Sequence, residues 1–214
     1  MKYIDIDSWP RKKHYQLFKG MDYPHFNLCA NVDITELRSY IKDSDLSFFK
    51  SFLYIAVRTA NEIPEFRYRI RDNKVVVHDR VDPSFTIMRE DETFSFCHAT
   101  YYRDFQSFYQ EAEGKTRIYN ENPTLKDGPG SDSLLFITSI PWLSFTSLTH
   151  PIHMNPVDSV PRIAWGKFFE ENGKIQLPVS VQAHHALMDG LHVGRFFNLL
   201  QDYLDNPETF IHNK

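Results

Sequence analysis

The sequence predicts an α/β fold of the α+β two-layer sandwich kind, in which helices pack on one side of a mixed β-sheet. Apolar and polar residues alternate through residues 175–185, which is the period of a strand with one buried face. Apolar residues recur at three- and four-residue spacing in residues 46–61 and 193–204, which is the period of a helix packed on a sheet. Strands and helices alternate without a strict βαβ rhythm, which favours a mixed sheet.

Length and charge limit the class of protein. A chain of 214 residues is most simply one domain, which we expect to cover residues 1–214. Its 24 basic and 28 acidic residues give a net charge of −4, and no basic block indicates binding to nucleic acid or to a membrane. No run approaches the ~20 apolar residues of a membrane span, and the start lacks a signal core, so we expect a cytoplasmic protein.

The two cysteines do not indicate a metal site. Cys29 and Cys97 lie in strand-like surroundings without CxxC or metal-ligand spacing. We therefore expect two buried free thiols and no bound metal.

Helices dominate the expected elements in the first part of the chain. Residues 8–18 predict a short helix that Ser8 caps. Residues 25–32 predict a strand, and residues 34–43 a helix with an acidic side chain in its first turn. Residues 46–61 carry a wide apolar face, which is more typical of a core helix than of a cofactor site.

Strands dominate the expected elements that follow. Residues 66–70 and 75–78 flank a turn signal and predict a hairpin. Residues 85–88 and 93–100 continue the strands. Apolar residues at helical spacing then predict a helix over residues 104–119.

The last third of the chain begins with a loop signal and ends with a hairpin. Residues 120–132 are rich in Asn, Pro, Gly, Asp and Ser, and residues 134–137 predict a buried strand after that loop. Residues 162–169 and 174–185 predict a hairpin across Asn172-Gly173, because that dipeptide accepts the positive φ angles of a tight turn.

Functional residues are expected where the last strand runs into the last helix. His185 ends the strand on its apolar parity, and Asp189 lies near the start of the helix, where a carboxylate suits the free N–H groups and the helix dipole. A neutral imidazole on a rigid strand end, with a carboxylate four residues on, is a plausible general base near pH 7. Taken singly, a histidine is more often structural or exposed than catalytic.

The segment HHALMDGLHVGRF resembles the active-site signature HHxxxDGxHxxRF of the chloramphenicol acetyltransferases, the trimeric type A family. Dihydrolipoyl acyltransferase domains share only the HxxxDG core of that signature. Other segments agree with the family in order along the whole chain: residues 9–15, 32–35, 81–86 and 140–145.

The resemblance implies a fold like that of coenzyme A-dependent acyltransferases and a homotrimer with active sites between subunits. His185 would deprotonate the acceptor hydroxyl directly in a ternary complex with acetyl-CoA. Arg11 would pair with Asp189, although composition alone favours a solvated arginine. Thr138 stands where the family has the serine that donates to the oxyanion, and Ala164 stands where it has a water-holding threonine.

The resemblance also implies the binding residues. Trp142, Lys167 and Phe168 would contact coenzyme A, although without the family Trp142 suits a core and Lys167 suits solvent. Chloramphenicol or a similar small molecule would be the acceptor, and antibiotic resistance the role. The residues expected to line its pocket are Phe18, Phe26, Leu148 and His150. The segments that carry Phe18 and Phe26 depart from the family, and His150 adds polarity where the family has apolar residues.

The departures leave two alternatives open. The chain could transfer the acetyl group to a different small alcohol or amine. It could also be a catalytically lapsed binding protein with the same fold.

Overall fold

The structure is a computed structural model that describes residues 1–42, 44–127 and 132–211. Its helices are α1 (Lys12–Phe18), α2 (Thr35–Lys42), α3 (Phe48–Glu62), α4 (Phe105–Glu121) and α5 (Gly190–Asp205), with short 3₁₀ turns η1 (Pro64–Arg67) and η2 (Pro207–Thr209). Its strands are β1 (Lys2–Tyr3), β2 (His25–Asp33), β3 (Tyr68–Arg71), β4 (Lys74–Val77), β5 (Asp82–Met88), β6 (Phe94–His98), β7 (Leu134–Ser139), β8 (Arg162–Trp165), β9 (Phe169–Glu171) and β10 (Lys174–His184).

A mixed sheet of seven strands organises the fold. Its order is β2-β10-β8-β7-β5-β6, and β9 pairs with the first part of β10. Strand β7 is parallel to both β5 and β8, whereas the other pairs are antiparallel. A smaller sheet of order β1-β4-β3 lies beside it. The prediction of a mixed rather than parallel sheet is therefore confirmed.

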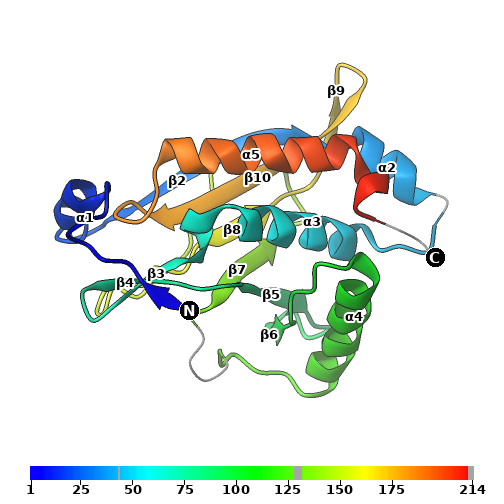
Figure 1. Cartoon of the computed structure of the whole chain (residues 1–214). Helices are drawn as coiled ribbons and strands as arrows, with labels where there is room; N and C mark the ends of the chain where they lie inside the picture. Colours follow the sequence, from blue (N-terminus) through cyan, green and yellow to red (C-terminus); the bar gives the residue numbers. More distant parts are fainter. Residues whose placement is uncertain (43, 128–131, 212–214) are drawn as a thin grey trace.

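The helices cover one face of the large sheet, as the sequence predicts. Helices α5 and α3 run along this face, and α4 packs against β6 and α3 at its far end (Figure 1). The core between the layers takes one parity of β10, including Leu177, Val179 and Val181, together with Phe52 and Phe196 from the helices. These side chains are essentially inaccessible to solvent.

The opposite face of β10 is also buried, so the prediction of a strand with one exposed face is wrong. Ser180, Gln182 and His184 are all at most 2% exposed. The irregular segment between β7 and β8 covers them: the Ser180 hydroxyl donates to the Leu148 carbonyl at 3.2 Å, and the His150 N–H donates to Gln182 Oε1 at 2.7 Å. Because this segment has no hydrophobic period, the sequence pattern does not indicate that it packs on the sheet.

The two hairpin turns lie where the sequence predicts them, although the strands around them differ in their bounds, and the first helix begins later than expected. Helix α1 begins at Lys12, and Ser8 is not its cap, because the Ser8 hydroxyl instead bonds to Asp5. Both residues of the Asn172-Gly173 turn have positive φ angles, 53° and 75°, as predicted. Residue 43 of the expected second helix and residues 128–131 of the expected long loop lie outside the described residues.

Both cysteines are free thiols, and Cys97 is buried as expected, whereas Cys29 is only partly buried. Burial raises the pKa of the Cys97 thiol to about 12. Within the described ranges, no helix is long and apolar enough to cross a membrane, and no group of three or more His, Cys, Asp or Glu side chains could hold a metal ion.

Gly166 separates β8 from β9 at a point where another segment crosses closely. A Cβ atom at this position would lie 2.8 Å from the Leu143 carbonyl oxygen and 2.9 Å from the Pro178 ring. The expected strand over residues 162–169 is interrupted here, and the contact positions the chain that follows β7.

We expect Gly166→Ala to lower the free energy of unfolding by about 1–3 kcal/mol, because the new methyl group overlaps fixed backbone. Urea unfolding monitored by circular dichroism measures this change. Gly114→Ala is the matched control: Gly114 lies inside α4 with nothing within 4 Å, so the substitution should stabilise by up to about 1 kcal/mol. Equal effects of the two substitutions would contradict the steric explanation.

Candidate active site

His185 follows the last residue of β10 and is held between two aromatic rings. Its backbone N–H donates to the Pro24 carbonyl at 2.7 Å. The Phe18 ring stacks on its imidazole, with 3.9 Å between the ring centres and an interplanar angle of 4°. The centre of the Phe26 ring lies 4.7 Å from the centre of the imidazole. Nδ1 is buried, with no hydrogen-bond partner in the described part of the chain. Proton exchange between this ring and a substrate must therefore use Nε2.

Arg11 joins the N-terminal segment to the turn that carries His185. Its Nη1 donates to Asp189 Oδ2 at 2.6 Å, which is the ion pair that the family resemblance implies. Nη2 also donates to the His185 carbonyl at 2.8 Å, and Nε donates to the Ala186 carbonyl at 3.1 Å. The sequence does not predict these two contacts, which fix the backbone of the histidine directly.

Asp189 caps helix α5, and Arg11 links its carboxylate to the backbone carbonyl of His185. Its Oδ1 accepts the Leu191 N–H at 3.0 Å, and His192 Nδ1 accepts the Asp189 N–H at 3.1 Å, which together make a capping box. Burial raises the pKa of the Asp189 carboxyl. The hydrogen bond from Arg11 and the positive charges nearby lower this pKa by a larger amount, so its net shift is downward. The carboxylate therefore stays ionised at neutral pH.

The first histidine of the pair, His184, points into the interior. Its Nδ1 accepts the Ala186 N–H at 3.2 Å, and its ring packs edge-on against His25 at 5.0 Å. Burial, followed by the charge of a protonated His25, lowers the pKa of His184 to about 3. His184 is therefore neutral at pH 7 and belongs to the support of the site.

A hollow of about 1020 Å³ opens on the face of the sheet that the helices leave uncovered. Thr138 of β7 lies in its wall, together with His150, one of the residues expected to bind the acceptor. The lining includes Phe94, Phe96, Phe136, His153, Asp158 and Arg162. Burial lowers the pKa of His150 to about 4, with Arg162 adding to the shift, so this imidazole is neutral at pH 7.

The residues expected to form one site divide into two groups within the chain. Phe18 and Phe26 contact His185, whereas Thr138 and His150 line the hollow. Thr138 pairs with Ala164, and Ala164 pairs with Ser180, so two strand spacings and five residues of β10 separate it from His185. Standard strand dimensions put their Cα atoms roughly 19 Å apart. The predicted base and oxyanion donor therefore do not meet in one chain.

Leu148 belongs to neither group. Its carbonyl accepts the Ser180 hydroxyl within the segment that covers β10. Leu148 stays a predicted contact of the acceptor.

The residues expected to contact coenzyme A lie together on the surface. Trp142 is 62% exposed, so its assignment to the core is wrong. Lys167 is exposed, and two hydrogen bonds hold its segment beside the one after Trp142. The Lys167 N–H donates to the Leu143 carbonyl at 2.8 Å, and the Ser144 hydroxyl donates to the Lys167 carbonyl at 2.6 Å. The Arg38 guanidinium lies 4.7 Å from the Phe168 ring and adds a cation that the sequence pattern does not indicate.

Comparison with known proteins identifies the family. A family model described as chloramphenicol acetyltransferase matches residues 1–201. The chain belongs to the chloramphenicol acetyltransferase family. It is 35% identical to chloramphenicol acetyltransferase 2 of Haemophilus influenzae over 205 residues, covering 95% of this chain and 96% of that protein. It is 34% identical to the chloramphenicol acetyltransferase of Clostridium perfringens over 215 residues, covering 99% and 98%.

Solved structures agree with this family assignment. A chloramphenicol acetyltransferase structure superposes with a TM-score of 0.84 at 31% identity, covering 95% of this chain and 99% of that one. The dihydrolipoamide acetyltransferase of Azotobacter vinelandii shares the fold alone, with a TM-score of 0.66 at 17% identity over 92% of this chain and 88% of that one. The resemblance of the HHALMDGLHVGRF segment to the chloramphenicol acetyltransferase family is thus confirmed.

We expect the stability of the protein to fall as the pH is lowered from about 7 to about 5. Unfolded His184 takes up a proton with a pKa near 6.5, whereas the folded side chain stays neutral down to about pH 3, so acid favours the unfolded chain. This single group contributes roughly 2 kcal/mol over that interval. Urea unfolding across this range should show a shallower pH dependence for His184→Gln. The same slope in both proteins would exclude His184 as its source.

Proposed function

We propose that this chain transfers the acetyl group of acetyl-CoA to a hydroxyl of chloramphenicol or a similar small molecule. Relatives named as chloramphenicol acetyltransferases match nearly its whole length and support the reaction. The observation that carries the proposal is the fixed imidazole of His185, which presents one edge while Arg11 holds its backbone. A rigid, correctly oriented base is what direct deprotonation of an alcohol needs.

His185 acts as general base in a ternary complex. Its Nε2 takes the proton of the acceptor hydroxyl, and the hydroxyl oxygen attacks the thioester carbonyl carbon. The resulting tetrahedral oxyanion accepts a hydrogen bond from the Thr138 hydroxyl. The bond from carbon to sulfur then breaks, and the imidazolium returns its proton to the thiolate of coenzyme A. No acyl-enzyme forms.

The separation between His185 and Thr138 supports a homotrimer with shared sites. Two residues whose Cα atoms lie roughly 19 Å apart in one chain cannot both act on one tetrahedral carbon. A cyclic trimer lets His185 of one chain face the hollow of the next. Trp142, Lys167, Phe168 and Arg38 then bind coenzyme A, because exposed aromatic rings and cations suit its adenine and phosphates.

His185→Ala should lower kcat for acetyl transfer by about 10²–10⁴-fold, because it removes the base. Thiol release from acetyl-CoA with chloramphenicol as acceptor measures the rate. His98→Ala on β6 is the control, since His98 contacts neither His185 nor the hollow, and its rate should match that of the unsubstituted protein. An undiminished rate for His185→Ala would contradict His185 as the base, whereas no thiol release and no thermal stabilisation by acetyl-CoA would favour the lapsed binding protein.

Mixed trimers test whether the two groups meet between chains. Thr138→Ala should lower kcat about 10²–10³-fold by removing the oxyanion donor. A trimer that mixes His185→Ala and Thr138→Ala chains contains one intact pairing, so random mixing should restore about one quarter of the original activity. Refolding an equal mixture of the two inactive proteins and assaying thiol release checks this. Activity no higher than the mean of the parents would show that the site is not shared.

A further inference from the structure

One wall of the hollow is made of irregular chain between β7 and β8. We call residues 148–160 the wall segment, because they contribute His150 and Asp158 to the lining. Within these residues, all of which the structure describes, an isolated bridge between Met154 and Val157 is the only strand pairing. Contacts with other parts of the chain must therefore fix the path of the wall segment.

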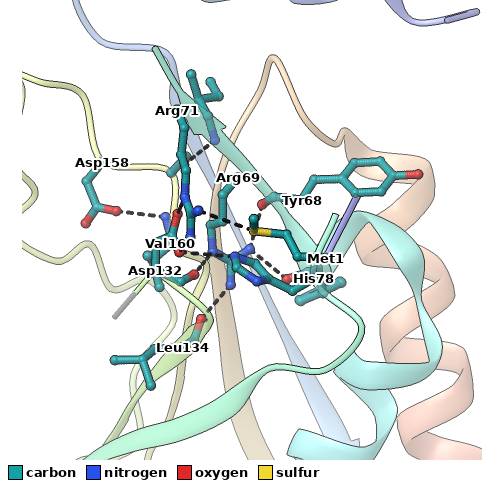
Figure 2. Close-up of polar contacts among 12 residues, drawn as sticks. Met1, Tyr68, Arg69, Arg71, His78, Asp132, Leu134, Asp158 and Val160 are labelled. Carbon is teal, nitrogen blue, oxygen red and sulfur yellow. Dashed lines mark hydrogen bonds and ion pairs between the residues drawn. The ribbon is translucent and has the colours of Figure 1, made fainter. Parts of the chain in front are cut away.

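Several contacts hold the end of the wall segment that precedes β8. The Ser159 hydroxyl oxygen accepts the Ile70 N–H at 2.9 Å, and His25 Nε2 lies 2.8 Å from the Asp158 carbonyl oxygen. Figure 2 shows Asp158 close to Arg69 of β3. This end is thus tied to strands of both sheets.

The other end of the wall segment depends on two side chains of β10. Gln182 Oε1 accepts the His150 N–H at 2.7 Å, and the Ser180 hydroxyl donates to the Leu148 carbonyl at 3.2 Å. Among the described residues, the hydrogen bonds that join this end to the sheet come from these two side chains. The bond to Gln182 is the shorter of the two, and it holds the backbone of a residue that lines the hollow.

Gln182 is itself held in a fixed position. It is only 1% exposed, and its backbone pairs with Asn27 on one side and with Arg162 on the other. Its Nε2 lies 3.5 Å from the Tyr23 hydroxyl. A backbone N–H can only donate, so this side chain must present its oxygen to His150. An apolar side chain would leave that N–H without a partner.

The contact with His150 serves a different site from the one that His185 of the same chain serves. Gln182 lies three residues before His185, whose backbone is held instead by Arg11 and by the Pro24 carbonyl. In the proposed trimer, the hollow of one chain receives the imidazole of its neighbour. Gln182 therefore shapes a hollow whose base comes from another chain.

We propose that Gln182 is a positioning residue for the acceptor. Its amide oxygen holds the wall segment in the shape that receives the acceptor beside Thr138. It acts on the hollow of its own chain and not on His185 of its own chain. This inference rests on the proposed acetyl transfer and adds the residue that shapes acceptor binding.

The first test removes the amide oxygen and keeps a side chain of similar length. Gln182→Met should raise KM for chloramphenicol about tenfold and leave kcat and KM for acetyl-CoA within about twofold, because the acceptor itself must then order the wall segment. Thiol release from acetyl-CoA measures all three values. Gln182→Asn withdraws the oxygen by one methylene and should raise the same KM if Gln182→Met does not assemble.

Gln201→Met is the matched control. Gln201 Oε1 also accepts a backbone N–H, from Asp33 at 2.9 Å, but this bond joins α5 to β2 outside the hollow. The substitution should lower stability and leave KM for chloramphenicol unchanged.

Mixed trimers assign the effect to one chain. In a mixture of His185→Ala and Thr138→Ala chains, each working site takes its hollow from the first chain and its base from the second. Gln182→Met added to the His185→Ala chain should raise KM for chloramphenicol about tenfold. Added to the Thr138→Ala chain, it should leave this KM unchanged. A general loss of stability would affect both mixtures alike.

The outcomes distinguish this inference from the proposed function. Equal KM values in the two mixtures, or an unchanged KM in Gln182→Met itself, overturn the inference and leave acetyl transfer intact. Mixtures no more active than their parents refute the shared site, and the KM of Gln182→Met against that of Gln201→Met then decides the positioning role.

No thiol release from the unsubstituted protein overturns the proposed function. Calorimetry with chloramphenicol then decides the inference. Binding about tenfold weaker in Gln182→Met than in Gln201→Met upholds the positioning role, whereas equal affinities or no binding refute it.

Discussion

The contact on which the rest of the site depends is the fork of Arg11. One guanidinium satisfies the Asp189 carboxylate and the carbonyls of His185 and Ala186, which the strand and helix leave without partners. Because Asp189 also caps α5, a single side chain joins three elements at the point where the sheet ends. A planar group with several donors in fixed directions can do this, whereas an ammonium group cannot. The imidazole is therefore positioned through its backbone and by the Phe18 and Phe26 rings, and no carboxylate of the described residues bonds to its ring.

The helix-covered half of the molecule follows from local pattern. The alternation in residues 175–185 predicts β10, and the spacing after Gly190 predicts α5, because these periods report which side chains face the core. The dipeptide Asn172-Gly173 predicts its turn because the backbone angles there suit few other residues. The family signature adds the pairing of Arg11 with Asp189, which spacing alone cannot supply.

The other half does not follow from local pattern. The segment between β7 and β8 has no period, so nothing in it predicts that it buries Ser180 and Gln182. The distance from Thr138 to His185 depends on the strand order, which puts β8 between β7 and β10. Arg162 reads as an ordinary strand residue until the structure puts Asp158 beside it. In the first two cases the missing information is the pairing of distant segments, which sequence periodicity does not contain. In the third it is the local path of the chain, because Asp158 lies only four residues before Arg162.

The Arg11–Asp189 contact can form only when synthesis of the chain is nearly complete. The two residues are 178 positions apart, so the ribosome makes Arg11 early and Asp189 near the end. Phe18, which stacks on the imidazole, likewise waits for a partner that emerges late. A chain that ends before residue 185 would therefore lack both the imidazole and the carboxylate that Phe18 and Arg11 contact.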